Sequence, residues 1–161
     1  MPSSSKSGKK EIVDWFNKHP IIKTILDIGC GKGTYPKLLG NKYVWLGIEI
    51  YEPYVKKYEL QRLYQTLILG DCMKVKWPKA DCVIFGDVME HLSKNVIDVI
   101  LEKAAWYPHM IVSIPLNSKQ KAVLGNPHEE HKSIWTWEEL NAMFGKEFER
   151  KNCGDIAIFM R

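Results

Sequence analysis

Acidic and imidazole side chains stand close together in the segment DVMEHL, where Asp87, Glu90 and His91 occupy positions i, i+3 and i+4. Residues three and four apart share one face of a helix, so these side chains could converge. A further imidazole, His131, comes from an irregular segment at residues 115–133 that is typical of a functional lid. Two carboxylates and two imidazoles suit Mg²⁺ or another divalent ion such as Mn²⁺, Fe²⁺ or Co²⁺. The candidate metal ligands are therefore Asp87, Glu90, His91 and His131.

The chemistry expected of this group is activation of a hydroxyl. A divalent ion would bind a substrate hydroxyl and lower its pKa, which produces an oxygen nucleophile near neutral pH. Without an ion, His91 or His131 could act as a general base. The candidate catalytic residues are therefore Glu90, His91 and His131. A structural interpretation stays open, because acids in the first turn of a helix stabilise the helix dipole.

A glycine-rich turn, LDIGCGKG at residues 26–33, follows a short apolar run that is typical of a buried strand. Glycines at such a turn let a ligand approach the backbone closely and direct helix N–H groups at it. The spacing is GxGxG rather than the GxGxxG of dinucleotide sites. Asp27, which precedes the first glycine, would repel a pyrophosphate but could help to hold an ammonium group. The turn predicts a nucleotide-like ligand, although a plain strand-to-helix connection also favours glycine.

Acids follow the next predicted strands as well. Glu49 ends the second strand about 20 residues after the turn, where a carboxylate can accept both hydroxyls of a ribose. Asp71 follows the third strand and could bind the exocyclic amine of adenine, and the fourth strand runs into Gly86 and Asp87. Together these acids predict a pocket for a cationic adenosyl ligand that carries no phosphate.

These segments together resemble class I S-adenosylmethionine-dependent methyltransferases. The resemblance implies that S-adenosylmethionine is the cofactor, with its methionine part at the glycine turn and its ribose at Glu49. It also implies that Ile50 packs on the adenine and that Asp71 and the Cys72 backbone bind the adenine edge. The implied cofactor-binding residues are Asp27, Gly29, Cys30, Gly31, Glu49, Ile50, Asp71, Cys72, Gly86 and Asp87.

The order acid-x-x-Glu-His, followed by HEEHKSIWTWEEL, also resembles two O-methyltransferase branches. One comprises the small-RNA 3′-end 2′-O-methyltransferases, in which similar residues hold a metal; the other comprises the quinone-pathway O-methyltransferases. The chain departs from the RNA branch in having Asp87 and in lacking an added RNA-binding domain. We expect a small hydroxylated acceptor, with the terminal 2′-hydroxyl of an RNA as an alternative. A catalytically inactive, cofactor-binding partner subunit is the third hypothesis.

The elements that must position these residues alternate between strands and helices through residue 114, which predicts a parallel sheet covered on both faces. Only residues 153–155 join the last two strands, so the last strand must run antiparallel to its neighbour. We expect an α/β fold with a three-layer, doubly wound, mostly parallel seven-stranded sheet. Strands are expected at residues 23–28, 43–50, 65–69, 81–85, 110–114, 147–152 and 156–160. Helices are expected at residues 11–19, 34–39, 53–63, 90–106 and 136–144.

The composition is that of a globular protein: of 161 residues, 45% are apolar and 26% charged. No apolar stretch approaches the roughly 18 residues of a membrane span, so no membrane partner is expected. Residues 1–10, MPSSSKSGKK, predict a flexible basic leader before a single methyltransferase domain at residues 11–161. The four cysteines form no CxxC pair, which favours reduced thiols and a cytoplasmic location. A net charge of +4 gives nucleic-acid binding little support, and the oligomeric state stays open.

Overall fold

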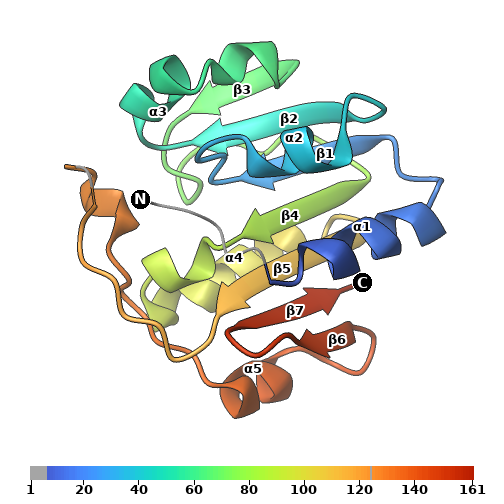
Figure 1. Cartoon of the computed structure of the whole chain (residues 1–161), viewed down its shortest axis with the longest axis vertical. Helices are drawn as coiled ribbons and strands as arrows, with labels where there is room; N and C mark the ends of the chain where they lie inside the picture. The colour runs from blue at the N-terminus through green and yellow to red at the C-terminus, as the bar shows by residue number, and fades with distance from the viewer. Residues whose placement is uncertain (1–6, 124) are drawn as a thin grey trace.

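A computed structural model describes residues 7–123 and 125–161, which form a seven-stranded sheet with helices on both faces (Figure 1). The order across the sheet is β3-β2-β1-β4-β5-β7-β6, and only β7 runs against the other strands. The predicted fold, with a reversed last strand, is therefore confirmed. The strands are β1 (Thr24–Ile28), β2 (Val44–Glu49), β3 (Thr66–Leu69), β4 (Cys82–Gly86), β5 (His109–Pro115), β6 (Glu149–Asn152) and β7 (Ile156–Met160).

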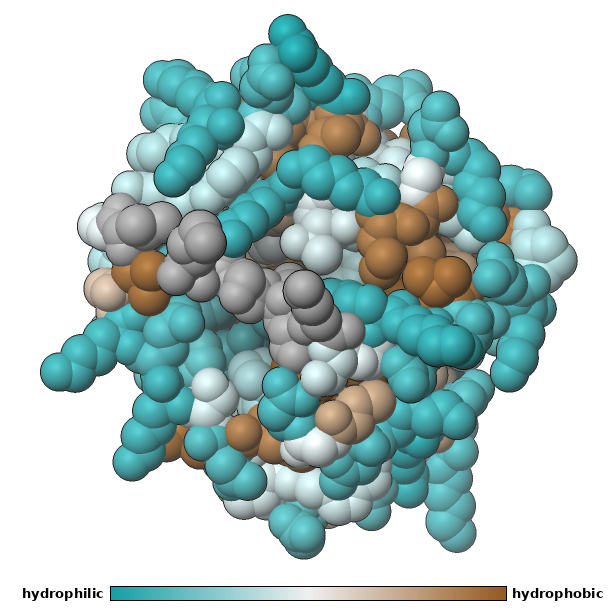
Figure 2. Space-filling model, viewed as in Figure 1, coloured by the Kyte–Doolittle hydropathy of each residue, from teal (hydrophilic) through white to brown (hydrophobic). Residues whose placement is uncertain are grey.

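The burial of the strands follows their place in the sheet. The central strands β1, β4 and β5 are buried over nearly all of their length, as expected for parallel strands with helices on both faces. The edge strand β6 has the sequence ERKN and is mostly exposed. Charged side chains on an edge strand oppose pairing with another sheet. Figure 2 shows that polar and charged side chains dominate this face of the molecule, with apolar side chains in a few small patches.

Helices complete the two outer layers. Figure 1 shows α1 (Lys9–Lys18) in front of the sheet and α4 (Ile97–Ala104) behind it. Apolar residues of α1, α2 (Thr34–Leu39) and α3 (Glu52–Lys57) form one core with the near face of the sheet. Those of α4 and α5 (Trp137–Met143) form the second core with the other face. Within residues 7–123 and 125–161, every helix is too short or too polar to cross a bilayer.

The N-terminal helix starts earlier than predicted. It begins at Lys9, because Gly8 adopts a left-handed conformation (φ 76°) and accepts the hydrogen bond of the Ile12 amide. Gly8 is buried so closely against Ile158 that a Cβ would lie 2.1 Å from that side chain. Lys9 and Lys10, which the sequence assigns to the basic leader, therefore belong to α1. The rest of the leader prediction, at residues 1–6, lies outside the described residues.

The predicted helix over residues 90–106 is wrong in its first half. The chain instead forms two 3₁₀ turns, η2 (Met89–His91) and η3 (Lys94–Val96), before α4 begins. Leu92 and Ser93 between the two turns are extended, with ψ values of 149° and 145°. Two short turns can bury the same apolar side chains as one helix, so the apolar periodicity does not distinguish them. The helix predicted over residues 53–63 likewise divides at the left-handed Glu59 (φ 50°), and η1 (Leu60–Arg62) follows.

Candidate functional site

A cavity of about 820 Å³ opens at the carboxyl ends of the parallel strands. Its wall includes the ends of β1, β2, β4 and β5 and the segment that follows β5. In this sheet β2 and β3 lie on one side of β1 and β4 lies on the other. The chain connections therefore diverge between β1 and β4, which is the place where doubly wound sheets bind their ligands. The predicted residues that line the cavity are Gly29, Cys30, Gly31, Glu49, Ile50, Asp71, Cys72, Gly86, Asp87, Glu90, His91 and His131.

The glycine turn forms part of the cavity wall. Gly29, Gly31 and Gly33 all adopt left-handed conformations, with φ values of 71°, 53° and 66°. A Cβ on Gly29 would lie 2.7 Å from the Val88 side chain, so the turn also requires a small residue for packing. Cys30 is buried beneath the turn, and burial raises the pKa of its thiol. Gly29 and Gly31 thus present backbone to the cavity.

Glu49 joins the end of β2 to this turn. Its Oε2 atom accepts a hydrogen bond from the Gly31 amide and its Oε1 atom accepts one from the Tyr51 amide, both at 2.8 Å. The side chain is only 4% exposed, and burial raises the pKa of its carboxyl against the opposing effect of these amides. Each carboxylate oxygen keeps a second lone pair that a ligand hydroxyl could use. Ile50, next in the chain, is 40% exposed at the same wall.

Hydrogen bonds hold the turn after β3 in the cavity wall. Asp71 Oδ1 accepts a hydrogen bond from the Met73 amide at 2.9 Å. The Cys72 carbonyl accepts hydrogen bonds from Trp77 Nε1 at 2.8 Å and from Lys103 Nζ at 2.9 Å. These contacts fix the backbone of Asp71 and Cys72 before any ligand is present.

Asp27 is the predicted cofactor residue that does not line the cavity. Successive side chains of a strand point to opposite faces, and Asp27 points into the core beneath α1 to α3, where its Oδ2 accepts a 2.6 Å hydrogen bond from the Tyr64 hydroxyl. It is 1% exposed, and burial raises the pKa of its carboxyl to about 7. The predicted direct contact of Asp27 with an ammonium group is therefore not formed in this structure, because the carboxyl is buried in the core and does not line the cavity.

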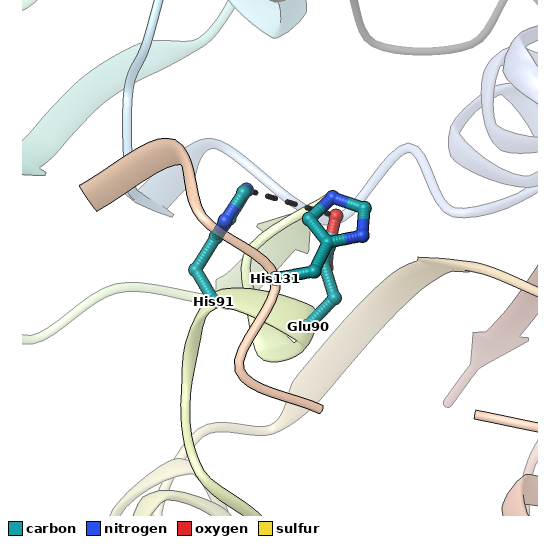
Figure 3. Close-up of side chains that lie close together, drawn as sticks. All are labelled: Glu90, His91 and His131. Atoms are coloured by element: carbon teal, nitrogen blue, oxygen red, sulfur yellow. Dashed lines mark ion pairs between the residues drawn. The ribbon is translucent and has the colours of Figure 1, made fainter. Parts of the chain in front are cut away.

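The structure brings Glu90, His91 and His131 together, although His131 lies 40 residues after His91 in the chain (Figure 3). One potential ligand atom from each lies within 4.8 Å of the others. His91 Nε2 is 3.8 Å from Glu90 Oε1, and the two imidazole rings have centroids 5.0 Å apart. The spacing is that of groups that could share one ion.

Backbone carbonyls orient both imidazoles. His91 Nδ1 lies 3.2 Å from the Glu130 carbonyl oxygen, and His131 Nδ1 lies 3.1 Å from the Ser118 carbonyl oxygen. A carbonyl oxygen can only accept, so each Nδ1 carries a proton, and in the neutral ring Nε2 then has the lone pair. Burial lowers the pKa of His91, which favours this neutral form. Metal-binding histidines commonly have such a partner on the other ring nitrogen.

Glu90 supports the same interpretation. It is 2% exposed, and its Oε2 atom has no hydrogen-bond partner among the described residues. Burial, and then the charge of Asp87, raise the pKa of its carboxyl well above the usual value. A buried acceptor without a partner destabilises a fold, and a cation would supply what it lacks. The donor set of one carboxylate and two imidazoles fits a divalent ion.

Asp87 is the predicted metal ligand that stays outside this group. Its backbone is left-handed (φ 58°), and its Oδ1 accepts a 2.9 Å hydrogen bond from the Ser113 hydroxyl. Its Oδ2 faces Lys9 Nζ at 4.0 Å. Lys9 also donates a 2.9 Å hydrogen bond to the Tyr35 hydroxyl, and burial lowers the pKa of this lysine. The structure thus groups three of the four predicted ligands, and the fourth, Asp87, has its Oδ2 beside a lysine of α1 without a hydrogen-bond partner among the described residues.

No protein-family model and no curated protein matches this sequence. Solved structures do match. The methyltransferase domain of the bacterial protein CtHen1 shares 20% identity at a TM-score of 0.65, over 99% of this chain and 100% of that chain. Magnesium protoporphyrin IX methyltransferase (ChlM) from Synechocystis PCC 6803, solved with SAH bound, shares 16% identity at a TM-score of 0.65, over 94% and 80%. The mitomycin 7-O-methyltransferase MmcR shares 15% identity at a TM-score of 0.66, over 95% and 53%.

The chain has the methyltransferase fold. The resemblance to S-adenosylmethionine-dependent methyltransferases is thus confirmed in its architecture. Within this methyltransferase fold the cavity has further wall residues that the sequence does not single out. Tyr54 of α3 lines it, as do Gln120 and Glu129 of the segment after β5. The described part of that segment, for which a lid is predicted, forms one wall of the cavity. No sequence pattern signals Gln120, whereas Glu129 belongs to the HEEH run.

Proposed function

We propose that the chain transfers the sulfonium methyl group of S-adenosylmethionine to an oxygen atom of a small hydroxylated acceptor. One observation carries the proposal: a single cavity is lined both by the glycine turn with Glu49 and by the cluster of Glu90, His91 and His131. The first group suits an adenosyl ligand and the second suits a hydroxyl that must lose a proton.

The cofactor would lie along the carboxyl ends of β1 to β4. Glu49 would accept hydrogen bonds from the ribose hydroxyls, and Ile50 would pack against the adenine, whose edge Asp71 and the Cys72 backbone would bind. Gly29 and Gly31 would let the methionine part approach the backbone, with the Cys30 backbone between them. Gly86 and Asp87 would complete this side. The acids in the wall match a ligand with an ammonium and a sulfonium group but no phosphate.

The acceptor would lie beside Glu90, His91 and His131, which would hold a divalent ion such as Mg²⁺. When bound, such an ion would lower the pKa of the acceptor hydroxyl. These residues would orient the acceptor oxygen within about 3–3.5 Å of the methyl carbon, in line with the bond to sulfur. The oxygen–carbon bond forms as the carbon–sulfur bond breaks, and the electron pair of that bond stays on sulfur. Without an ion, Nε2 of His91 or His131 can accept the hydroxyl proton.

An RNA acceptor is the second candidate function. The CtHen1 methyltransferase domain matches over its full length, and the acid-x-x-Glu-His order of this chain resembles the 3′-end 2′-O-methyltransferases. An RNA acceptor would bind through its phosphates, so its affinity should fall steeply with salt concentration. A small neutral acceptor should show no such dependence. A catalytically inactive partner subunit would bind the cofactor and methylate neither.

The test is a methyl-transfer assay with S-adenosylmethionine against pooled RNAs and pooled hydroxylated metabolites, with added Mg²⁺, Mn²⁺ or Co²⁺ and with a chelator. His131→Ala is compared with His128→Ala, since both histidines lie in one segment but only His131 belongs to the cluster. We expect the chelator and His131→Ala each to lower the rate about 100-fold or more, with His128→Ala close to wild type. Equal rates in all samples would refute the role of the cluster, and no transfer to any acceptor would favour the inactive subunit.

A further inference from the structure

Gln120 links two parts of the irregular segment that follows β5, both next to the cluster of Glu90, His91 and His131. Its side-chain Nε2 atom donates a 2.8 Å hydrogen bond to the Glu129 carbonyl, and its backbone carbonyl accepts a 3.0 Å hydrogen bond from the His131 amide. One residue thus contacts the backbone on both sides of Glu130. Gln120 is half-buried in the cavity wall, and its side chain therefore forms this contact next to the cluster.

The carbonyls that orient the imidazoles lie within two residues of these contacts along the chain. The Glu130 carbonyl accepts from His91 Nδ1, and the Ser118 carbonyl, two positions before Gln120, accepts from His131 Nδ1. Further along, the amides of Lys132 and Ser133 both donate to the Glu90 carbonyl, at 2.8 and 3.0 Å. The segment therefore contacts every member of the cluster through its backbone.

The chain between Gln120 and Glu129 makes a long excursion, and two hydrogen bonds close its base: one from the Gln120 side chain to the Glu129 carbonyl and one from the His131 amide to the Gln120 backbone carbonyl. Among the described residues from 121 to 128, the backbone amides donate to local acceptors, such as that of Asn126 to Val123 and that of His128 to Asn126. Local bonds leave the ends of such a loop free to separate, and closing a loop has an entropic cost. A tie between Gln120 and Glu129 closes the excursion at its base.

We propose that Gln120 is a positioning residue: it fixes residues 129–131 so that each imidazole keeps its Nδ1 on a backbone carbonyl and its Nε2 available to a divalent cation shared with Glu90. The inference rests on the proposed function, because it assigns a role at the same cluster. The potential ligand atoms of the cluster come from Glu90, His91 and His131. The effect of Gln120 passes through the Glu129 and Glu130 backbone to the imidazoles.

Cobalt(II) binding to the full chain tests the proposal without an acceptor. Titration followed by the visible absorption of Co²⁺ reports both affinity and ligand geometry. Gln120→Met keeps the length of the side chain but removes the donor, and we expect about tenfold weaker Co²⁺ binding with an altered spectrum. Gln120→Glu keeps the shape and puts an acceptor against the Glu129 carbonyl, so it should bind Co²⁺ as weakly. Lys119→Met, at an exposed neighbouring position, is the control and should match wild type.

Two further measurements separate positioning from general damage. Affinity for S-adenosylhomocysteine, the demethylated product of the cofactor, should change by less than about twofold in Gln120→Met, since Gln120 bonds to the backbone of Glu129 and His131 and not to the glycine turn. Imidazole ¹H–¹⁵N correlations of the metal-free chain should show His131 as the Nδ1–H tautomer in wild type and as a mixture in Gln120→Met.

Three results would overturn the inference. Unchanged Co²⁺ affinity and spectrum in both Gln120 variants would show that the cluster does not depend on this tie. Equal losses of Co²⁺ and S-adenosylhomocysteine affinity would show general loosening. Absence of Co²⁺ binding by wild type would refute the metal site of the proposed function and the inference with it, whereas the first two results would leave that site standing.

Discussion

The Glu49 carboxylate and the Gly31 amide form a 2.8 Å hydrogen bond that joins the end of β2 to the turn after β1. The contact connects residues 18 positions apart and leaves both in the cavity wall. A ligand that binds to one of them must therefore also meet the other.

Glu49→Gln should weaken cofactor binding. The amide replaces one acceptor oxygen with an NH₂ group, which cannot accept from the Tyr51 or Gly31 amide or from a ribose hydroxyl. We expect the Kd for S-adenosylhomocysteine, measured by calorimetry, to rise about 10- to 100-fold. Glu52→Gln, at an exposed position on α3, is the control. Equal affinities of the two variants would contradict a role of Glu49 in holding the ribose.

Gly31→Ala and Gly154→Ala should separate backbone strain from ligand contact. Both glycines are left-handed, with φ values of 53° and 87°, and neither has a neighbour that would block a methyl group. Each substitution should lower the free energy of unfolding by about 1–2 kcal/mol in a urea titration. Of the two added methyl groups, only the one at position 31 would enter the cavity, so only Gly31→Ala should weaken binding of S-adenosylhomocysteine. Normal binding by Gly31→Ala would place the ligand elsewhere.

Glu90→Leu should abolish divalent-metal binding and raise the thermal stability of the fold. The substitution removes a buried carboxyl whose Oε2 lacks a partner among the described residues, a defect that typically costs about 1–3 kcal/mol. We expect the Tm to rise by about 2–4 °C for each kcal/mol gained, while Co²⁺ binding disappears. Glu102→Leu, at an exposed position on α4, should change neither quantity. A lower Tm for Glu90→Leu, or retained Co²⁺ binding, would contradict the assignment.

Asp27→Asn should flatten the dependence of stability on pH. Burial raises the pKa of Asp27 to about 7 in the folded protein, against about 3.9 in an unfolded chain. The folded state therefore binds more protons between these values, and wild type should lose stability as the pH rises from about 4 to about 7. The asparagine oxygen can still accept from Tyr64, so the variant should gain stability relative to wild type above pH 7, as measured by urea unfolding. Asp98→Asn, which is exposed, is the control; an equal slope in Asp27→Asn and wild type would refute the raised pKa.

Much of this site can be predicted because parallel strands end at one edge of the sheet. Glu49 and Asp71 follow apolar runs, and simple topology brings such residues to the same edge as the glycine turn. His131 can be identified as well, since irregular segments near strand ends often carry functional groups. These inferences need only the order of the elements along the chain.

The positions of Asp27 and Asp87 depend on contacts that the order of elements does not determine. Asp87 pairs with Lys9 only because α1 docks against the sheet, and residues 9 and 87 have no common pattern in the sequence. Asp27 is oriented by the alternation of β1, whose register against the cavity depends on the whole sheet. The hydrogen bonds of Gln120 arise from an irregular loop, for which no periodicity exists.

The reversal of β7 affects more than the count of parallel strands. Because this strand runs backwards beside β5, its first residues reach the same edge as the glycine turn, and Asp155 and Ile156 enter the cavity wall. The short hairpin between β6 and β7 is thereby an adjustable boundary for whatever molecule enters. Insertions there could reshape the acceptor side in a laboratory selection while the residues that surround the adenosyl group keep their places.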